Sequence, residues 1–136
     1  MLAELRFHHI GIAVNNISET AALYINAGYE KTDTVFDPVQ NVHICFLSKS
    51  GMPTLELLAP NDENSPVYKT LQKNGVTPYH CCYEADDIEE AVSKLRKLRY
   101  VVISRPVPAV AMESKRVCFL FNKKTGLIEL VESKKV

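Results

Sequence analysis

The sequence lacks a net charge, because its sixteen lysines and arginines are matched by sixteen aspartates and glutamates. A neutral chain has no overall field that attracts nucleic acid or an anionic membrane surface, so we expect neither as a partner. It also lacks any apolar run near the roughly 18–20 residues that a membrane helix needs. Glu4 and Arg6 interrupt the first residues, which therefore do not resemble an export signal. We expect a cytoplasmic protein whose partner is a small molecule.

A Cys-x-x-Cys motif is missing as well, although the chain has four cysteines: Cys45, Cys81, Cys82 and Cys118. Cys81 and Cys82 are adjacent, and neighbouring residues of a strand point to opposite faces and rarely bridge one another. Without a motif or an export signal, the cysteines are predicted to be reduced, mostly buried thiols in a reducing compartment.

What the sequence does contain is an internal repeat within a length that fits one domain. A shift of 71 residues aligns identical residues, among them His9 with His80, Ile17 with Ile88, and Tyr29 with Tyr100. A shift of 73 residues aligns Phe46-Leu47 with Phe119-Leu120 and Leu55-Glu56-Leu57 with Ile128-Glu129-Leu130. The identities are few, but the aligned residues have matching structural roles in the two copies.

Each copy reads as a strand, a helix and three further strands. In the first copy, Asn16 or Ser18 can cap a helix that carries an apolar stripe including Leu23 and ends before Gly28. The expected elements of the first copy are strand 7–14, a helix to about Ala27, and strands 30–36, 41–49 and 53–59. Those of the second are strand 79–85, a helix capped by Asp86 or Asp87, and strands 100–104, 116–122 and 127–132, with a loop at Pro106 and Pro108.

The predicted fold class is therefore α+β, with two repeated βαβββ modules in a single domain covering residues 1–136. The first module spans about 6–59 and the second about 78–132. Between them, Ser65 and Pro66 open a linker helix within about 65–75, where proline suits the first helical position.

Two histidines and two glutamates carry the functional prediction. Strand alternation places His9 and His80 opposite their aliphatic neighbours, and places Glu56 and Glu129 opposite the apolar residues that flank them. If the halves pair, the four side chains converge, and buried carboxylates must be paired or must bind a cation. Two carboxylates also balance the charge of a divalent ion that two neutral imidazoles help to bind. A single strand histidine is more often structural, and a single glutamate usually faces solvent, so the repetition favours metal binding.

The role of His43 stays open at this point. It alternates with Val42 and Ile44, and it can therefore point into the same cavity as Glu56.

Four segments, HHIGIAV at 8–14, LELLAPNDENSP at 55–66, YHCCYEADDIEEAV at 79–92 and GLIELVE at 126–132, resemble the vicinal oxygen chelate, or glyoxalase-fold, superfamily. Among its members the sequence is most similar to methylmalonyl-CoA epimerases. Lactoylglutathione lyases are similar too, and share Glu at position 56, where the epimerases often have Gln. The lyase-type Asp-Pro-Asp-Gly turn is absent. The chain also departs from the epimerases, with Phe121-Asn122-Lys123 in place of His-Pro-Lys and Tyr79-His80 in place of a histidine doublet.

The resemblance implies a curved sheet around a metal site with His9, Glu56, His80 and Glu129 as ligands. It implies an epimerase or isomerase that acts on an α-carbonyl acyl thioester through a metal-stabilised enediolate. Glu129 would be one proton-transfer group, and His43, at the position of a second catalytic glutamate of some epimerases, would be the other. The ion can be Co, Mn, Ni, Fe or Zn. Alternatives are a lyase and a non-catalytic binding protein of the same fold.

Members of this superfamily commonly pair, so we expect a homodimer. Exchange of modules between two chains is an open alternative to their pairing within one chain. If the substrate is a CoA thioester, four basic residues are candidates for its phosphates: Lys115, Arg116, Lys123 and Lys124.

Overall fold

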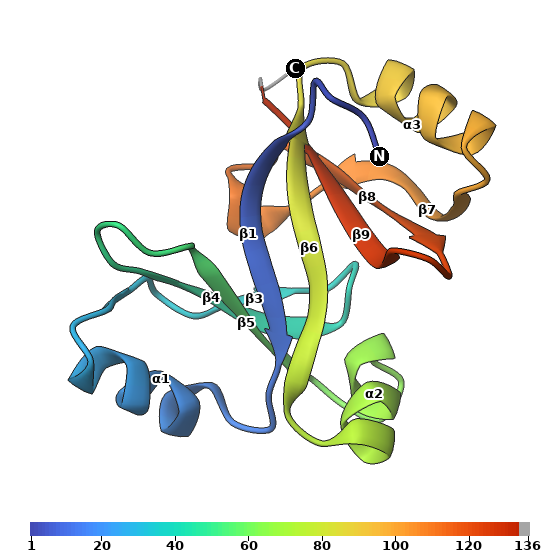
Figure 1. The fold of residues 1–136 in the computed structure, drawn as a ribbon. Coiled ribbons are helices and arrows are strands. Elements are labelled where there is room, and N and C mark those ends of the chain that lie inside the picture. Colours follow the sequence, from blue (N-terminus) through green and yellow to red (C-terminus); the bar gives the residue numbers. More distant parts are fainter. Residues whose placement is uncertain (134–136) are drawn as a thin grey trace. The chain divides into compact units, whose positions relative to one another are not determined.

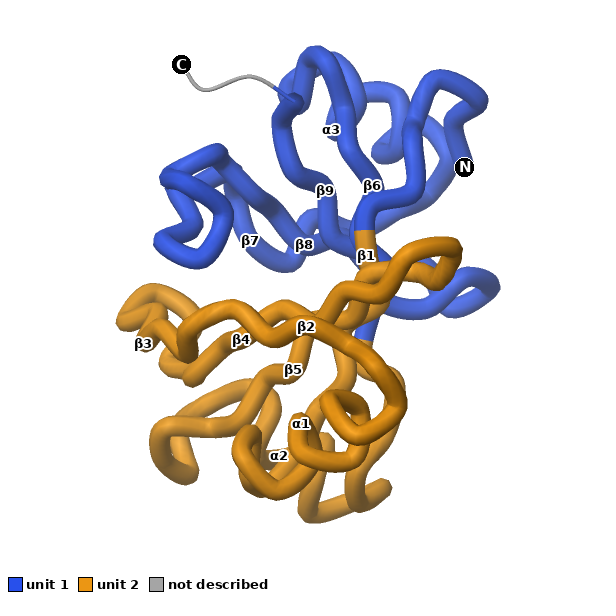
Figure 2. Tube along the Cα trace, turned by 90° about the vertical axis from the view of Figure 1, so that its left-hand side faces the viewer, with its two compact units in different colours: residues 1–8, 80–136 blue, residues 9–79 orange. Residues whose placement is uncertain are grey.

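The computed structural model describes residues 1–133, and they form two compact units. One unit consists of residues 9–79, and the other combines residues 1–8 with the chain from residue 80 onward (Figure 2). The element order follows the βαβββ plan twice, which matches the predicted α+β class. That the whole chain is a single domain stays a prediction.

The unit of residues 9–79 has a mixed sheet with strand order β2-β4-β5-β1, in which β3 also pairs with β4 (Figure 1). β1 runs parallel to β5, while β2, β3 and β5 are antiparallel to β4. The elements are β1 (Arg6–Ala13), α1 (Ile17–Asn26), β2 (Glu30–Lys31), β3 (Val35–Asp37), β4 (Val42–Ser48), β5 (Leu55–Pro60) and α2 (Pro66–Asn74).

The strand predicted at 30–36 is split into β2 and β3. Lys31 pairs with Leu47 and Val35 pairs with Ile44, so four steps along this segment oppose three steps along β4. One extra residue leaves the ladder, as in a β-bulge. Thr32 fixes the break, because its Oγ1 accepts a hydrogen bond of 2.9 Å from the backbone N–H of Phe46.

Helix α1 covers one face of the sheet in this unit. Asn16 caps it by accepting a hydrogen bond of 2.9 Å from the backbone N–H of Glu19. Gly28 follows the helix at a φ of +94°, a conformation that favours glycine. Leu23 was predicted to belong to the buried stripe, but it is 75% exposed. The packed side of the helix is narrower than the apolar pattern indicates, and its fully buried members are Ile17 and Ala21.

The second unit has strand order β6-β9-β8-β7. β6 is parallel to β9, and the remaining pairs are antiparallel. Its elements are β6 (Thr77–Ala85), which begins in the first unit, α3 (Ile88–Lys97), β7 (Val101–Pro108), the short 3₁₀ helix η1 (Val110–Met112), β8 (Arg116–Asn122) and β9 (Gly126–Glu132). α3 packs on β7 and β9 (Figure 1).

The loop predicted at Pro106 and Pro108 is part of β7. This strand is longer than the predicted 100–104, and it ends the strand order of its unit. An end strand tolerates proline, because one row of its backbone groups has no neighbour to bond.

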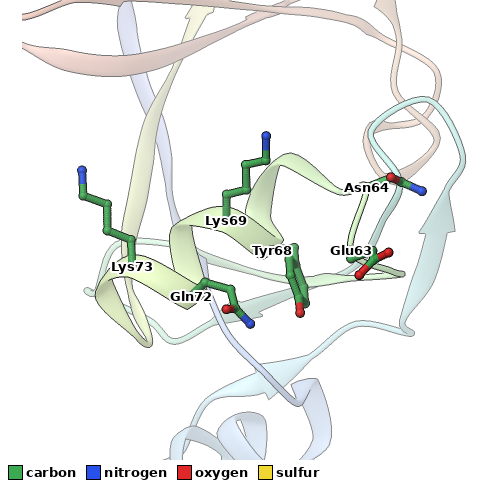
Figure 3. A pocket seen from close by; sticks show the side chains of 6 residues that line it. All are labelled: Glu63, Asn64, Tyr68, Lys69, Gln72 and Lys73. Atoms are coloured by element: carbon green, nitrogen blue, oxygen red, sulfur yellow. The ribbon is translucent and has the colours of Figure 1, made fainter.

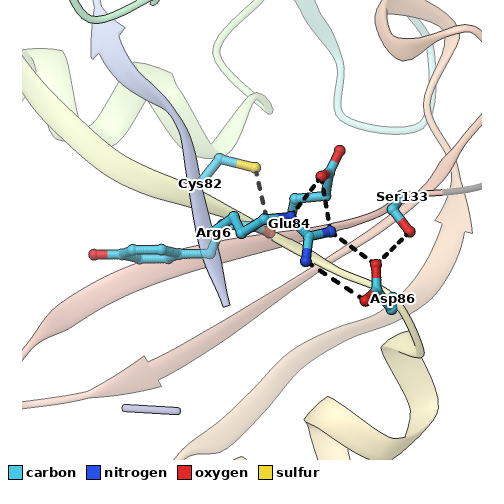
Figure 4. Close-up of polar contacts among 6 residues, drawn as sticks. Arg6, Cys82, Glu84, Asp86 and Ser133 are labelled. Atoms are coloured by element: carbon cyan, nitrogen blue, oxygen red, sulfur yellow. Dashed lines mark hydrogen bonds and ion pairs between the residues drawn. The ribbon is translucent and has the colours of Figure 1, made fainter. Parts of the chain in front are cut away.

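The first residues of the chain belong to this second unit. Leu2 and Leu5 pack against its core. The Arg6 guanidinium donates to the Glu84 carboxylate at 2.9 and 3.1 Å and to Asp86 at 2.8 Å (Figure 4). The Ser133 hydroxyl donates to the same Asp86 carboxylate at 2.9 Å. These ion pairs attach the start of β1 to the end of β6.

All four cysteines are free thiols, and Cys45, Cys82 and Cys118 are buried, as predicted. Among residues 1–133, no helix has the length and apolar character needed to cross a membrane.

Candidate functional site

The unit of residues 9–79 holds a buried pair formed by His9 and Glu56. His9 Nε2 lies 3.2 Å from Glu56 Oε1, and the two side chains are 0% and 2% exposed. β1 and β5 set this contact: Gly11 pairs with Glu56, and His9 shares the face of Gly11 by strand alternation. The Phe46 ring stands edge-on to the His9 ring at a centroid distance of 5.3 Å. Phe46 is also the cross-strand neighbour of Glu56.

The second unit holds an equivalent pair formed by His80 and Glu129. His80 Nε2 lies 3.1 Å from Glu129 Oε1, and the side chains are 0% and 1% exposed. Cys82, two residues along β6 from His80, pairs with Glu129 on β9. The Phe119 ring stands edge-on to the His80 ring at 5.3 Å, and Phe119 is the cross-strand neighbour of Glu129.

The two units thus repeat one arrangement of three side chains, phenylalanine, histidine and glutamate. The imidazole planes meet the phenyl planes at 80° and 87°, so the repetition extends to ring orientation. The phenylalanines were aligned by the sequence repeat, but no role was predicted for them. Each ring packs against its histidine and holds the imidazole beside the carboxylate.

The spacing within each pair fits two adjacent ligands of one metal ion. Bonds of about 2.1 Å that meet at a right angle, as in an octahedral site, separate the two donor atoms by about 3.0 Å. The observed separations are 3.2 and 3.1 Å. The same distance suits a hydrogen bond, so each pair alone is compatible with a structural role. Four buried groups of ligand type in two matching pairs favour a metal.

The thiols near these carboxylates are poor nucleophiles. Burial, with the charge of Glu129 as the next cause, raises the pKa of the Cys118 thiol to about 12. Burial is also the main reason that the pKa of Cys45 is raised, and the charge of Glu56 adds to it. Both cysteines lie in the apolar layers beneath the helices. They stay protonated at neutral pH and act as core residues.

His43 does not share the face of Glu56, so the prediction that it can point into the same cavity is wrong. The uninterrupted β4–β5 register pairs Phe46 with Glu56 and His43 with Ala59. Residues three apart on a strand point to opposite faces. Ala59 belongs to the apolar cluster beneath α1, which places His43 on the helix-bearing side of the sheet.

On that side His43 is engaged in local structure. Its Nε2 lies 3.0 Å from Asn61 Oδ1, and its ring packs against Phe36 at 5.1 Å between centroids. The residues of β4 on the Glu56 face are Val42, Ile44, Phe46 and, at the end of the strand, Ser48, and none of them is an acid or a base. A second acid or base from β4 is therefore absent on that face.

Arg116, predicted as a phosphate contact, is already neutralised. Its guanidinium donates to Glu89 at 2.6 and 3.1 Å and to Glu132 at 3.2 Å. These hydrogen bonds, that to Glu89 first, raise the pKa of Arg116 above its ordinary value. Arg116 joins α3 to β8 and β9, so its guanidinium is engaged in the structure of this unit and does not serve as a phosphate contact.

Comparison with known proteins gives a consistent result. Residues 8–119 match the family model of the glyoxalase/bleomycin resistance protein/dioxygenase superfamily. The chain is 34% identical to human mitochondrial methylmalonyl-CoA epimerase, over 94% of this chain and 74% of that protein. It is 33% identical to the ethylmalonyl-CoA/methylmalonyl-CoA epimerase of Cereibacter sphaeroides, over 87% and 89% of the two chains.

Solved structures agree with the sequence comparison. Methylmalonyl-CoA epimerase from Mycobacterium tuberculosis superposes with a TM-score of 0.87 at 25% identity, over 99% of this chain and 94% of that one. A methylmalonyl-CoA epimerase in complex with methylmalonyl-CoA and NH4+ superposes with a TM-score of 0.83 at 30% identity, over 98% of each chain. The glyoxalase-like fold predicted from the sequence is confirmed.

Proposed function

Because the chain belongs to the glyoxalase/bleomycin resistance protein/dioxygenase superfamily, we propose that it is a metal-dependent epimerase of methylmalonyl-CoA or a closely related α-carbonyl acyl thioester. The observation that carries the proposal is the pair of matching, buried His–Glu contacts at ligand spacing. Two relatives that match more than nine-tenths of the chain support it, since both are named methylmalonyl-CoA epimerase. These relatives are enzymes, which agrees with the prediction from the sequence that the chain is an enzyme.

We propose that His9, Glu56, His80 and Glu129 bind one divalent ion together. Two imidazoles and two carboxylates give a neutral complex with such an ion, and mixed nitrogen and oxygen ligands suit Co, Mn, Ni, Fe or Zn. When bound, the ion supplies positive charge that stabilises the enediolate-type charge formed as the substrate loses its α-proton.

The chain's own contribution is to move that proton and to exclude water. In this proposal the Glu129 carboxylate accepts the α-proton. His80 Nε2 lies 3.1 Å from this carboxylate, and Phe119 is the cross-strand neighbour of Glu129. Its burial keeps bulk water away from the carbanionic carbon. The protonated Glu129 can return the proton only to the face from which it came. Inversion therefore requires a second proton donor, an acid or a water molecule, on the opposite face of that carbon, and this donor does not come from β4. His43 has no part in these steps, because it lies on the other face of its sheet.

The test is exchange of solvent deuterium into methylmalonyl-CoA by metal-loaded protein. Glu129→Gln should lower the exchange rate by roughly 10²–10⁴-fold. His43→Ala should retain the parent exchange rate, although His43 was a catalytic candidate from the sequence.

Elemental analysis should find one ion per chain in the parent protein and less in His9→Ala and in His80→Ala. Absence of bound metal, or of exchange in the metal-loaded protein, would refute the proposal.

A lyase acting on a glutathione hemithioacetal is the second candidate. Glu56 favours it, since the sequence resemblance gives Glu at this position to lactoylglutathione lyases and often Gln to epimerases. Turnover of the hemithioacetal without deuterium exchange into methylmalonyl-CoA would select the lyase. The homodimer and the cytoplasmic location stay predictions, and light scattering of the purified protein tests the first of them.

A further inference from the structure

Polar side chains converge in some parts of this chain and diverge in others. In the hollow beside α2, Lys69 and Lys73 extend to one side of the helix (Figure 3). Tyr68 and Gln72 extend to the other side, so these polar groups do not meet at one ligand. The two His–Glu pairs differ, because in each unit further residues hold the pair in place.

In the unit of residues 9–79, the backbone of Phe46 is bonded to Thr32. The Phe46 N–H donates to Thr32 Oγ1 at 2.9 Å, and the Phe46 carbonyl accepts from the Thr32 N–H at 3.0 Å. In a regular antiparallel pair the carbonyl of Thr32 would accept the first of these bonds. Here that carbonyl accepts from Lys31 Nζ at 2.9 Å instead. The hydroxyl therefore replaces a carbonyl that the irregularity between β2 and β3 removes from the ladder.

The second unit repeats this substitution. The Phe119 N–H donates to Ser104 Oγ at 3.1 Å. Ser104 is the partner of Phe119 on β7, and the β7–β8 register is irregular on both sides of this pair. Neither shift of the sequence repeat aligns the two hydroxyl residues, since Thr32 falls on Ile103 at a shift of 71 and on Arg105 at a shift of 73. The structure therefore shows a correspondence that the repeat does not contain.

These hydrogen bonds determine how close each phenylalanine lies to its glutamate. The N–H and C=O of a residue in an antiparallel strand point toward the same neighbouring strand. Each phenylalanine directs its N–H to a hydroxyl, so it does not bond to the strand of its glutamate. Phe46 and Glu56 are therefore a non-hydrogen-bonded pair, the kind in which the side chains lie closest. The same holds for Phe119 and Glu129.

We propose that Thr32 and Ser104 are positioning residues of the metal site. Each hydroxyl fixes the backbone of a phenylalanine, and the ring of that phenylalanine fixes the imidazole beside the carboxylate. The histidine and glutamate of each half are thereby held at ligand spacing before an ion binds, which lowers the cost of ordering them. The inference rests on the proposed function for the ion itself.

The first measurement is the imidazole NMR spectrum of the full, metal-free chain, because the shielding of an imidazole proton depends on the orientation of a nearby phenyl ring. Thr32→Val removes the hydroxyl with little change of shape, and it should move the signals of His9 more than those of His80. Ser104→Ala should do the reverse. Thr32→Ser and Ser104→Thr keep a hydroxyl, and they should keep the parent signals of both histidines.

The second measurement is the affinity of the same variants for Co²⁺, determined by competition with a chelator. Thr32→Val and Ser104→Ala should each weaken binding about tenfold, the lower end of the range for residues behind the ligands, whereas the two hydroxyl-retaining variants should stay within about twofold of the parent. Asn16→Ala is the control, since it removes a hydrogen bond of 2.9 Å from a side chain to a backbone N–H at the start of α1. It should leave both the His9 signals and the affinity unchanged.

The outcomes separate this inference from the proposed function. Moved histidine signals with an unchanged Co²⁺ affinity would overturn the inference, because the hydroxyls would then be purely structural. An equal loss of affinity in the hydroxyl-retaining variants or in the control would overturn it as well. If the parent chain binds no metal, the proposed function fails, and the histidine signals of the metal-free chain still decide whether the hydroxyls position the two pairs. The two units give separate tests, so a variant that does not fold leaves the other unit to decide.

Discussion

At the residue scale, Phe119 and its counterpart Phe46 are the side chains that connect packing with the candidate site. Phe119→Leu removes the edge-on contact with His80 and should lower the free energy of unfolding by about 1–2 kcal/mol. Urea titration of the metal-free protein measures this effect. Phe121→Leu on the same strand is the control, since Phe121 is 41% exposed, and it should cost less than about 0.5 kcal/mol. Equal costs for the two variants would show that the His80 contact adds no stability.

His43 shows what the sequence can and cannot establish about single residues. Alternation correctly separates His9 from Ile10, and Glu56 from Leu55 and Leu57. It does not reveal which face of β4 lies on the same side as Glu56, because that depends on the register between two strands. A shift of one residue in the β4–β5 pairing would exchange every side chain of β4 between the faces. For the four proposed ligands, the sequence repeat indicated which residues share a face, because each His and each Glu has a counterpart in the other half. No such counterpart was identified for His43.

At the scale of elements, the helix caps were predictable because they are local. Asn16 and Asp87 each accept a hydrogen bond from the backbone N–H three residues later. Asn16→Ala should therefore destabilise the protein by about 1 kcal/mol. Ser18→Ala is the matched control: this residue was the alternative predicted cap but lies inside α1, so its loss should have almost no effect. Thermal unfolding of both variants decides the assignment, and a larger loss from Ser18→Ala would contradict it.

The split between β2 and β3 and the length of β7 were not predictable in the same way. The extra residue between Lys31 and Val35 can be recognised only from the pairing of this segment with β4. Pro106 and Pro108 break most strands, and they fit in β7 because it ends the strand order of its unit. The position of a strand within a sheet is a tertiary property, and the local pattern does not contain it.

The contact between α3 and the strands beneath it should depend on acidity. The Arg116 guanidinium, as the first cause, lowers the pKa of Glu89. A carboxyl group whose pKa is lower in the folded state contributes stability above its unfolded pKa, about 4.5, and loses it as the pH falls through its folded value. Unfolding of parent protein and Glu89→Gln should therefore differ at pH 7 and converge in acid. A difference that persists at pH 2 would show that Glu89 acts through packing instead of charge.

At the scale of the whole molecule, the sequence repeat and the compact units divide the chain differently. The repeat assigns residues 6–59 to one module, whereas residues 1–8 belong to the unit built from residue 80 onward. β1 therefore begins in one unit and ends in the other, and β6 does the same in the opposite direction. The similarity of the two copies could not show this, because the residues before His8 have no sequence feature that assigns them to either unit.

Arg6 makes the attachment of the N-terminal segment testable. Arg6→Ala removes the ion pairs with Glu84 and Asp86, and leaves Asp86 with the Ser133 hydroxyl as its remaining contact in Figure 4. Amide hydrogen exchange should then become faster at the start of β1 and at the end of β6, while α1 keeps its protection. Because the pairs are exposed, added salt should reduce the difference between parent and variant. Arg96→Ala on α3 removes the same charge elsewhere in this unit and should leave exchange in β1 unchanged. Faster exchange throughout both units in Arg6→Ala would instead mean that β1 and β6 unfold together with the entire chain, and that the two units are not separate in stability.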